Sequence, residues 1–330
     1  MSVSRRPDLL PIVCLLANAF VWGVSWWPFR QLNALGLHSL WATSFAFFAS
    51  TLVISVWRPR AWPDLLANPA LVWLLLASGV TNAAFNWGVM IGEVVRVVLL
   101  FYLMPVWSVL LARWLLGERI SAAALLRIAL ALTGAAIVLW DPTVGLPLPA
   151  SLPDVLGLVG GMSFALVNVM VRRHAAAPDS ARALAMFVGG FTVAGSMAVL
   201  LSSGGRIAPL PPASFGWIAG VSALALVLLA ANFALQYGAA RLPAGVTALV
   251  MLSEVLFAAV SAAWIGGEPL TLPMLVGGAL ILVAAGLAAL PGRRPATDGH
   301  VPVEIAHVEP APAAEPTDDD RQARSVTRTS

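Results

Sequence analysis

The chain has 330 residues, of which 59% are hydrophobic and 11% are charged, against roughly 25% charged residues in ordinary soluble domains. All 19 basic residues are arginine, and the formal net charge is only +3. So few charged groups cannot cover a soluble surface, and so small a net charge forms no basic patch for nucleic acid. A soluble enzyme and a nucleic-acid-binding protein are therefore excluded for most of the chain.

The apolar residues come in blocks of roughly twenty, the length that crosses the hydrocarbon core of a bilayer. In chain order they predict ten membrane helices, at Leu9–Phe29, Ser39–Trp57, Ala70–Ile91, Val97–Leu116, Ser121–Trp140, Pro153–Val171, Ala183–Leu201, Ser214–Tyr237, Ala244–Ile265 and Thr271–Leu290. The first block is too long for a signal peptide and no small-residue cleavage site follows it, so we expect a retained helix. Residues 292–330 hold few large apolar groups and are predicted to form a disordered tail.

The two halves of the apolar region are related to each other. A shift of 150 residues aligns Asn82 with Asn232, Asn86 with Gln236, Trp114 with Trp264 and Glu118 with Glu268. The first helices align at a shift of 142 residues, which places Arg30 on Arg172. Each half holds five predicted helices, and an odd number makes the halves inverted repeats. We expect one repeat at 1–141, a second at 151–291 and the tail at 292–330.

The arginines predict the orientation of the chain in the membrane. Placing the N-terminus in the cytoplasm puts twelve arginines on that side: Arg5, Arg6, Arg58, Arg60, Arg113, Arg119, Arg172, Arg173, Arg182, Arg241, Arg293 and Arg294. The external loops then hold Arg30, Arg96 and Arg206. Membrane proteins concentrate Arg and Lys in cytoplasmic segments, so both termini are predicted to be cytoplasmic.

Three stretches resemble a known family. These are "ANAFVWGVSW" in the first helix, "FYLMPVWSVLLARWLLGERIS" across the fourth and fifth, and "LSEVLFAAVSAAWIGGEPLT" in the second half. With ten helices in two halves, they resemble the EamA-type branch of the drug/metabolite transporter superfamily. The resemblance covers residues 9–290 and implies secondary transport of small metabolites, often export of amino acids or related compounds. Val255 stands where the first half has Pro105, which removes the sequence signal for a distorted ninth helix.

Glu254 is the first candidate for a functional residue. It lies about ten residues into the ninth predicted span, where an ionisable side chain costs at least about 2.5 kcal/mol on insertion scales. Thr247 and Ser261 share its helix face, which makes a polar stripe. Glu254 is either a proton carrier that also contacts substrate, or a protonated acid that binds a neighbouring helix.

The other candidates are amides and aromatic side chains inside the predicted spans. They line a substrate cavity or, alternatively, hold helices together. The candidate substrate-binding residues are Asn18, Trp22, Trp26, Asn82, Asn86, Tyr102, Asn168, Asn232, Gln236 and Glu254.

Three charged residues lie near the ends of predicted spans. Arg96 meets either a substrate carboxylate at the mouth of the pathway or its neighbour Glu93. Glu118 and Glu268 each precede a helix, where an acid interacts favourably with the helix dipole, so we assign them to structure. The single cysteine, Cys14, and the scattered histidines form no metal-ligand spacing, so neither a metal nor a cofactor is expected.

The apolar spans and Glu254 predict a proton-coupled secondary transporter of the plasma (inner) membrane, and the family resemblance implies that it exports amino acids or related metabolites from the cytoplasm. Its expected partners are a small-molecule substrate, the proton and the lipid bilayer, with a monomer or homodimer as the assembly. A passive facilitator is the main alternative. An intramembrane enzyme is less favoured, because one deep acid and several amides supply no nucleophile with a base.

The predicted membrane orientation is tested by fusing a reporter to the end of residues 1–290, directly after Leu290. A fluorescent protein at that junction should fluoresce, and alkaline phosphatase should be inactive, because the arginine bias places the junction in the cytoplasm. Active phosphatase together with a dark fluorescent fusion would contradict the ten-helix topology.

Overall fold

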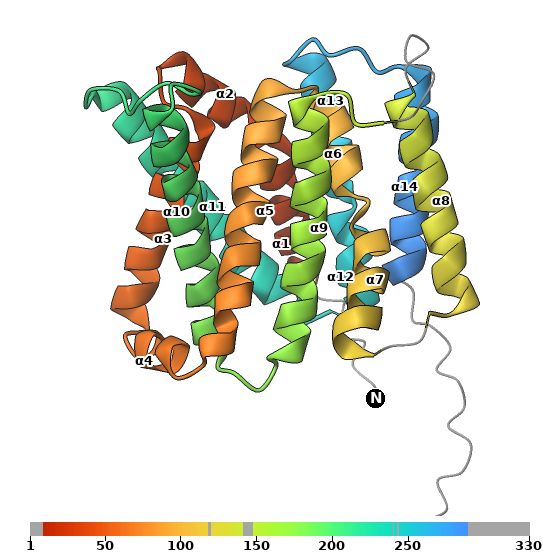
Figure 1. The fold of residues 1–330 in the computed structure, drawn as a ribbon, viewed down its shortest axis with the longest axis horizontal. Coiled ribbons are helices and arrows are strands. Elements are labelled where there is room, and N and C mark those ends of the chain that lie inside the picture. Colours follow the sequence, from red (N-terminus) through yellow and green to blue (C-terminus); the bar gives the residue numbers. More distant parts are fainter. Residues whose placement is uncertain (1–8, 118–119, 141–147, 240, 243, 290–330) are drawn as a thin grey trace, which may run out of the picture. The chain divides into compact units, whose positions relative to one another are not determined.

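The computed structural model describes residues 9–117, 120–140, 148–239, 241–242 and 244–289, and every regular element among them is a helix (Figure 1). The elements are α1 (Leu10–Val24), α2 (Trp26–Ala34), α3 (Ser39–Trp57), α4 (Ala61–Leu66), the 3-10 helix η1 (Pro69–Leu71), α5 (Val72–Ile91), α6 (Val94–Phe101), α7 (Met104–Leu116), α8 (Ala122–Leu139), α9 (Leu152–Arg173), α10 (Asp179–Ser203), α11 (Phe215–Ala239), α12 (Ala244–Met251), α13 (Ser253–Trp264) and α14 (Leu272–Ala289). The predicted all-helical class is confirmed. The predicted tail at 292–330 lies outside the described residues.

Most of these helices meet the requirements of a membrane span. Eight segments are long and apolar enough, at Leu10–Ala34, Ser39–Trp57, Pro69–Ile91, Val94–Leu115, Ala122–Leu139, Leu152–Arg173, Asp179–Ser203 and Phe215–Ala239. Shorter apolar helices follow at Leu249–Trp264 and Leu272–Leu287. The chain is therefore a multi-pass membrane protein, and the count of ten spans stays a prediction.

The fourth and ninth predicted spans are each broken into two short helices. The first break separates α6 from α7 at Tyr102 and Leu103, and Pro105 in the first turn of α7 has no N–H to donate. The second break separates α12 from α13 at Leu252, so the prediction of a continuous helix over 244–265 is wrong. No proline is needed there, because Leu252 N–H bonds to Leu249 O and the Ser253 hydroxyl donates to Val250 O.

Small residues bring several helices into close contact. In Figure 1, α8 and α14 lie side by side, and a Cβ built on either Gly134 or Gly277 would lie 2.5 Å from the carbonyl oxygen of the other. α5 approaches α10 in the same way, since a Cβ on Gly79 would lie 2.4 Å from Gly189 O. Such contacts suit lipid, where helices associate through close packing rather than through the hydrophobic effect.

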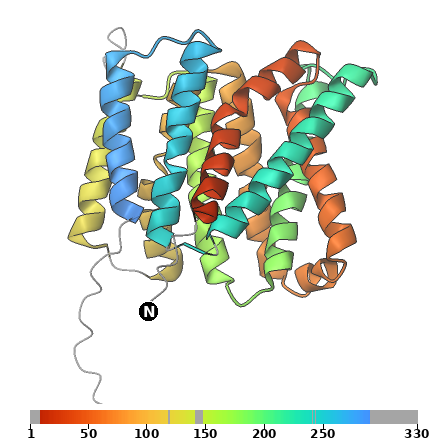
Figure 2. The ribbon, with the colours of Figure 1, turned by 180° about the vertical axis from the view of Figure 1, so that it is seen from behind.

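Further contacts also join helices of the two chain halves. α5 packs against α9 and α10, and α3 packs against α10 and α11. Figure 2 shows α1 between α13 and α11, and both of these helices contact it. An apolar core formed largely by α6, α8, α13 and α14 includes the fully buried side chains of Leu99, Leu100 and Ile281.

A buried histidine begins α3. The Nδ1 atom of His38 accepts a hydrogen bond from Leu40 N–H at 3.2 Å, which satisfies a donor of the first helical turn. Burial lowers the pKa of His38 to about 4, since it disfavours the charged ring. The ring therefore stays neutral near pH 7 and keeps the lone pair that caps α3.

The contact between α8 and α14 gives a direct stability test. Gly134→Ala should lower the unfolding free energy by about 1–3 kcal/mol, because its methyl group would meet backbone of α14 that cannot rotate away. Gly216→Ala is the matched control, since its nearest neighbour would be Leu35 Cδ1 at 3.8 Å. Thermal unfolding of the detergent-solubilised protein measures both. Equal unfolding temperatures for the two variants would show that α8 and α14 do not approach this closely.

Candidate functional site

The two helix breaks lie next to each other inside the protein. Tyr102, at the first break, is buried, and its hydroxyl donates to Glu254 Oε2 at 3.1 Å. Glu254 lies in the first turn of α13, directly after the second break. α6 also packs against α13, so the hydroxyl and the carboxylate are positioned by two helix ends that meet in the interior.

Three phenylalanines pack beside this pair. The ring of Phe101 at the end of α6 lies 4.9 Å from the ring of Phe85 in α5 and 5.5 Å from the ring of Phe164 in α9, between ring centres. We call Phe85, Phe101 and Phe164 the aromatic cluster. Gly161 shares a face of α9 with Phe164. Its missing side chain leaves room for the backbone of Phe101, because a Cβ on Gly161 would collide with that backbone.

Asn82 and Asn168 continue the helix faces that carry the aromatic cluster. Asn82 precedes Phe85 by three residues in α5, and Asn168 follows Phe164 by four in α9, so each lies one turn from the cluster. Asn82 is half-buried and donates to Ser78 O, whereas Asn168 is exposed. The structure thus brings these two amides to the same side of the cluster, toward the Arg172 end of α9.

Other predicted site residues are engaged in helix contacts. Asn18 donates to Ala231 O of α11 and Asn86 donates to the Thr43 hydroxyl of α3, while neither Oδ1 has a hydrogen-bond partner. Trp22 packs partly buried against the apolar core. Asn232 is half-buried and has a partner, and the side chain of Gln236 lies outside the described residues.

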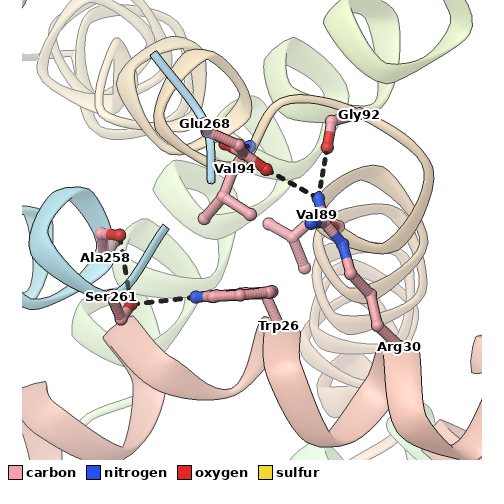
Figure 3. Close-up of polar contacts among 8 residues, drawn as sticks. All are labelled: Trp26, Arg30, Val89, Gly92, Val94, Ala258, Ser261 and Glu268. Atoms are coloured by element: carbon pink, nitrogen blue, oxygen red, sulfur yellow. Dashed lines mark hydrogen bonds and ion pairs between the residues drawn. The ribbon is translucent and has the colours of Figure 1, made fainter. Parts of the chain in front are cut away.

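A charged cluster lies at the other end of α6 and α13 (Figure 3). Arg30 Nη2 lies 2.9 Å from Glu268 Oε1 and 2.7 Å from Gly92 O, and the guanidinium stacks 4.7 Å from the Trp26 ring. Glu268 Oε2 accepts from Val94 N–H at 2.8 Å. The carboxylate therefore caps α6, rather than the helix that follows it in the chain as the sequence analysis assumed.

A hydrogen bond below this cluster joins α2 to α13. Trp26 Nε1 donates to the Ser261 hydroxyl at 2.9 Å, and that hydroxyl donates to Ala258 O (Figure 3). Trp26 and Ser261 are both buried. Trp26, a candidate substrate-binding residue in the sequence analysis, therefore makes a contact between two helices in this structure.

Arg96 has a partner that the sequence analysis did not consider. Its guanidinium pairs with both carboxylate oxygens of Asp154, at 2.6 and 3.1 Å, and donates to Val138 O. Asp154 is 1% exposed and also forms a capping box with Ser151 at the start of α9. The pair ties α6 to α8 and α9. No sequence signal separated Asp154 from an ordinary capping acid.

Comparison with known proteins locates the resemblance in the first half of the chain. The model of the EamA-like transporter family matches residues 9–140. The match supports a membrane transporter of the drug/metabolite type as the coarse function of the chain.

Two further comparisons add less. No curated protein matches the sequence. A solved structure titled "Crystal structure of protein" is similar over 88% of this chain and 99% of that chain, with 16% identity and a TM-score of 0.49.

The Arg96–Asp154 pair predicts a stability change. Arg96→Gln should lower the unfolding free energy by about 3–5 kcal/mol, because it leaves the Asp154 carboxylate buried without its counter-charge. Adding Asp154→Asn should recover part of that loss, since no buried charge then remains. Thermal unfolding of the two variants and of Asp154→Asn alone completes the cycle. A double variant no more stable than Arg96→Gln would contradict this account.

Proposed function

We propose that this protein is a proton-coupled secondary transporter that exports amino acids or related small metabolites across the plasma membrane by alternating access. Both termini would lie in the cytoplasm, and the two five-helix repeats would move relative to each other around a substrate near the middle of the bilayer. The observation that carries the proposal is the unequal packing of two helices, α6 and α12, that occupy equivalent places in the repeat.

The helix boundaries support the repeat. A shift of 150 residues carries the bounds of α6 from 94 and 101 onto 244 and 251, the bounds of α12. The same shift carries Gly117, which ends α7 with a φ of 71°, onto Gly267, which follows α13 with a φ of 66°. The two broken spans therefore have the same plan, although their sequences differ.

The helix contacts support an inverted pair of five-helix units. Exchanging each helix with its repeat equivalent carries the contact of α5 with α9 onto that of α11 with α1. The contacts of α3 with α10 and of α8 with α14 are carried onto themselves. A two-fold relation between the halves accounts for this pattern.

The equivalent half-helices differ in packing, and this difference supports alternating access. Every residue of α6 except Arg96 is buried, and α6 packs against α13. In the described part of α12 no side chain is buried, and α7, the equivalent of α13, packs against α8, α9 and α14 instead. Such a difference between equivalent half-helices is what alternating access would require of a transporter in one state of its cycle. In the orientation predicted from the arginine bias, the end beside α6 would be the external one.

The site for substrate would lie on the open side of the aromatic cluster. Asn82, Asn168 and the Tyr102–Glu254 pair approach this region, and an exposed amide inside a membrane span favours an aqueous space over lipid. Trp22 supplies an apolar wall. Glu254 would carry the proton, since an acid held by one hydroxyl inside a span is positioned to exchange a proton when substrate arrives or leaves.

Glu254→Gln tests the proton-coupling role. The amide keeps the shape and an acceptor for Tyr102 but cannot release a proton, so the variant should insert normally and lose proton-driven transport. Everted membrane vesicles with an imposed pH gradient, challenged with each common amino acid in turn, report exchange as recovery of acridine fluorescence. The wild-type protein should respond to at least one amino acid.

Glu93→Gln is the matched control, because Glu93 is an exposed acid outside the helices. It should exchange at the wild-type rate. Proton-coupled exchange by Glu254→Gln at the wild-type rate, at equal abundance, would remove Glu254 from the mechanism. Substrate movement without any proton movement in the wild-type protein would favour a passive facilitator.

A further inference from the structure

The two carboxylates of the α13 region hold the two ends of α6. Glu254, in the first turn of α13, accepts from Tyr102 just after the end of α6. Glu268, after the end of α13, accepts from Val94 N–H at the start of α6. α6 is therefore held to the α13 region at both of its ends. The two helices can separate fully only if the contacts at Glu254 and at Glu268 both break.

Glu268 also forms an ion pair with Arg30. The Arg30 side chain leaves α2, passes over the Trp26 ring and reaches the carbonyl of Gly92 at the end of α5 as well as Glu268 (Figure 3). Four segments thus meet at this point: α2, the α5–α6 connection, the start of α6 and the α13–α14 connection. A charge-assisted contact of this kind is directional and roughly twice as strong as a neutral hydrogen bond.

The backbone presents Glu268 toward α6. Gly267 adopts a φ of 66°, a left-handed conformation that glycine takes without steric cost, and Glu268 N–H then bonds back to Ala262 O. The chain turns sharply after α13, which points the carboxylate at the start of α6 instead of along α14.

Burial separates this cluster from the neighbouring ion pair. The side chains of Arg30 and Glu268 are 29% and 13% exposed, whereas Asp154 in the Arg96 pair is 1% exposed. Breaking the more exposed contact leaves the carboxylate of Glu268 closer to solvent, whereas breaking the Arg96–Asp154 pair leaves a fully buried carboxylate without its counter-charge. Of the two pairs, Arg30–Glu268 is the one suited to open and close.

We propose that Arg30, Glu268 and the Val94 N–H form a latch that holds α6 against α13 and closes the predicted external end. The inference rests on the proposed function, since it names the contact that opens and closes that transport pathway. Opening this end requires the latch to break and α6 to move away from α13, which uncovers Trp26 and Ser261 directly below.

The repeat extends the inference to the opposite end. The sequence equivalents of Arg30 and Glu268 are Arg172 and Glu118, so the same pair of residue types recurs there. Arg172 lies in the last turn of α9 and has a partner, and Glu118 lies outside the described residues.

A single cysteine below the latch reports its opening. The native Cys14 is replaced by Ser, and Ser261→Cys is introduced in the full-length protein, since Ser261 is 7% exposed and lies next to Trp26. A membrane-impermeant maleimide is added to right-side-out and to everted vesicles without any substrate. Labelling after denaturation gives the total available thiol in each sample.

Arg30→Gln and Glu268→Gln are then added separately to this reporter protein. Each should raise the labelling rate from the external side by about tenfold or more, because each removes a charge-assisted contact that favours the closed end. Together they should raise it little beyond the larger single effect, since both remove the same contact. Arg30→Lys, which keeps the charge, should restore part of the protection.

Arg96→Gln is the control for a general loss of order, because the Arg96 contacts with Asp154 and Val138 hold α6 to α8 and α9. It should leave the labelling rate near that of the reporter protein. Unchanged labelling in both latch variants, or equal labelling in Arg96→Gln, would overturn the latch. Faster labelling at the external side only in the latch variants supports it. These measurements need no substrate, so the latch can fail while exchange is intact, and exchange can be absent while the latch is supported.

Discussion

A helix that stops inside a bilayer leaves backbone groups that lipid cannot satisfy, and this constraint organises the interior of the protein. Unpaired N–H and C=O groups at membrane depth are tolerated only where protein or water covers them. The break between α6 and α7 and the break between α12 and α13 are therefore both turned inward, and α6 meets α13 there. The Tyr102–Glu254 contact is a consequence, since each break carries one of the two residues. The aromatic cluster packs beside the Tyr102–Glu254 pair, and Asn82 and Asn168 lie one helical turn from the cluster.

The two ion pairs that hold α6 differ in burial. The Arg96–Asp154 pair is buried, joins three helices and cannot open without stranding a carboxylate. The Arg30–Glu268 pair is partly exposed and joins segments that would have to separate in the proposed cycle. The two pairs connect α6 to different helices: the Arg96 pair attaches it to α8 and α9, and the Glu268 contacts, in the proposed latch, would connect it reversibly to α13. α6 would then move with α9 when the latch opens.

Much of the fold could be predicted because the bilayer sets the length of a span and because repeated landmarks survive in both halves. Arg30 and Arg172, or Glu118 and Glu268, are polar residues that stand out in an apolar sequence. The break at Leu252 could not be predicted, since it rests on local hydrogen bonds of Ser253 and Leu252 and not on a proline. The partner of Arg96 could not be predicted either, because Asp154 is distant in the chain and resembles any helix-capping acid. Neighbours in sequence, such as Glu93, are visible to pattern reasoning, but partners across helices are not.

The proposed repeat is unequal at the positions where the two breaks meet, and this inequality would affect the balance between the two proposed states. The equivalents of Tyr102 and Glu254 are Leu252 and Met104, so closing α7 against α12 brings apolar side chains together where closing α6 against α13 makes a hydrogen bond. A hydrogen bond to a charged group contributes about 1.5–3 kcal/mol, which corresponds to roughly a tenfold to hundredfold change in a two-state population. That bias favours the state described above, with α6 buried and α12 exposed. A substrate or proton that engages Glu254 competes with Tyr102 for the carboxylate and weakens the bias, which is how binding at the middle of the bilayer would change the balance between the two ends. A perfectly symmetric repeat would offer two states of equal energy but no residue through which a ligand could choose between them.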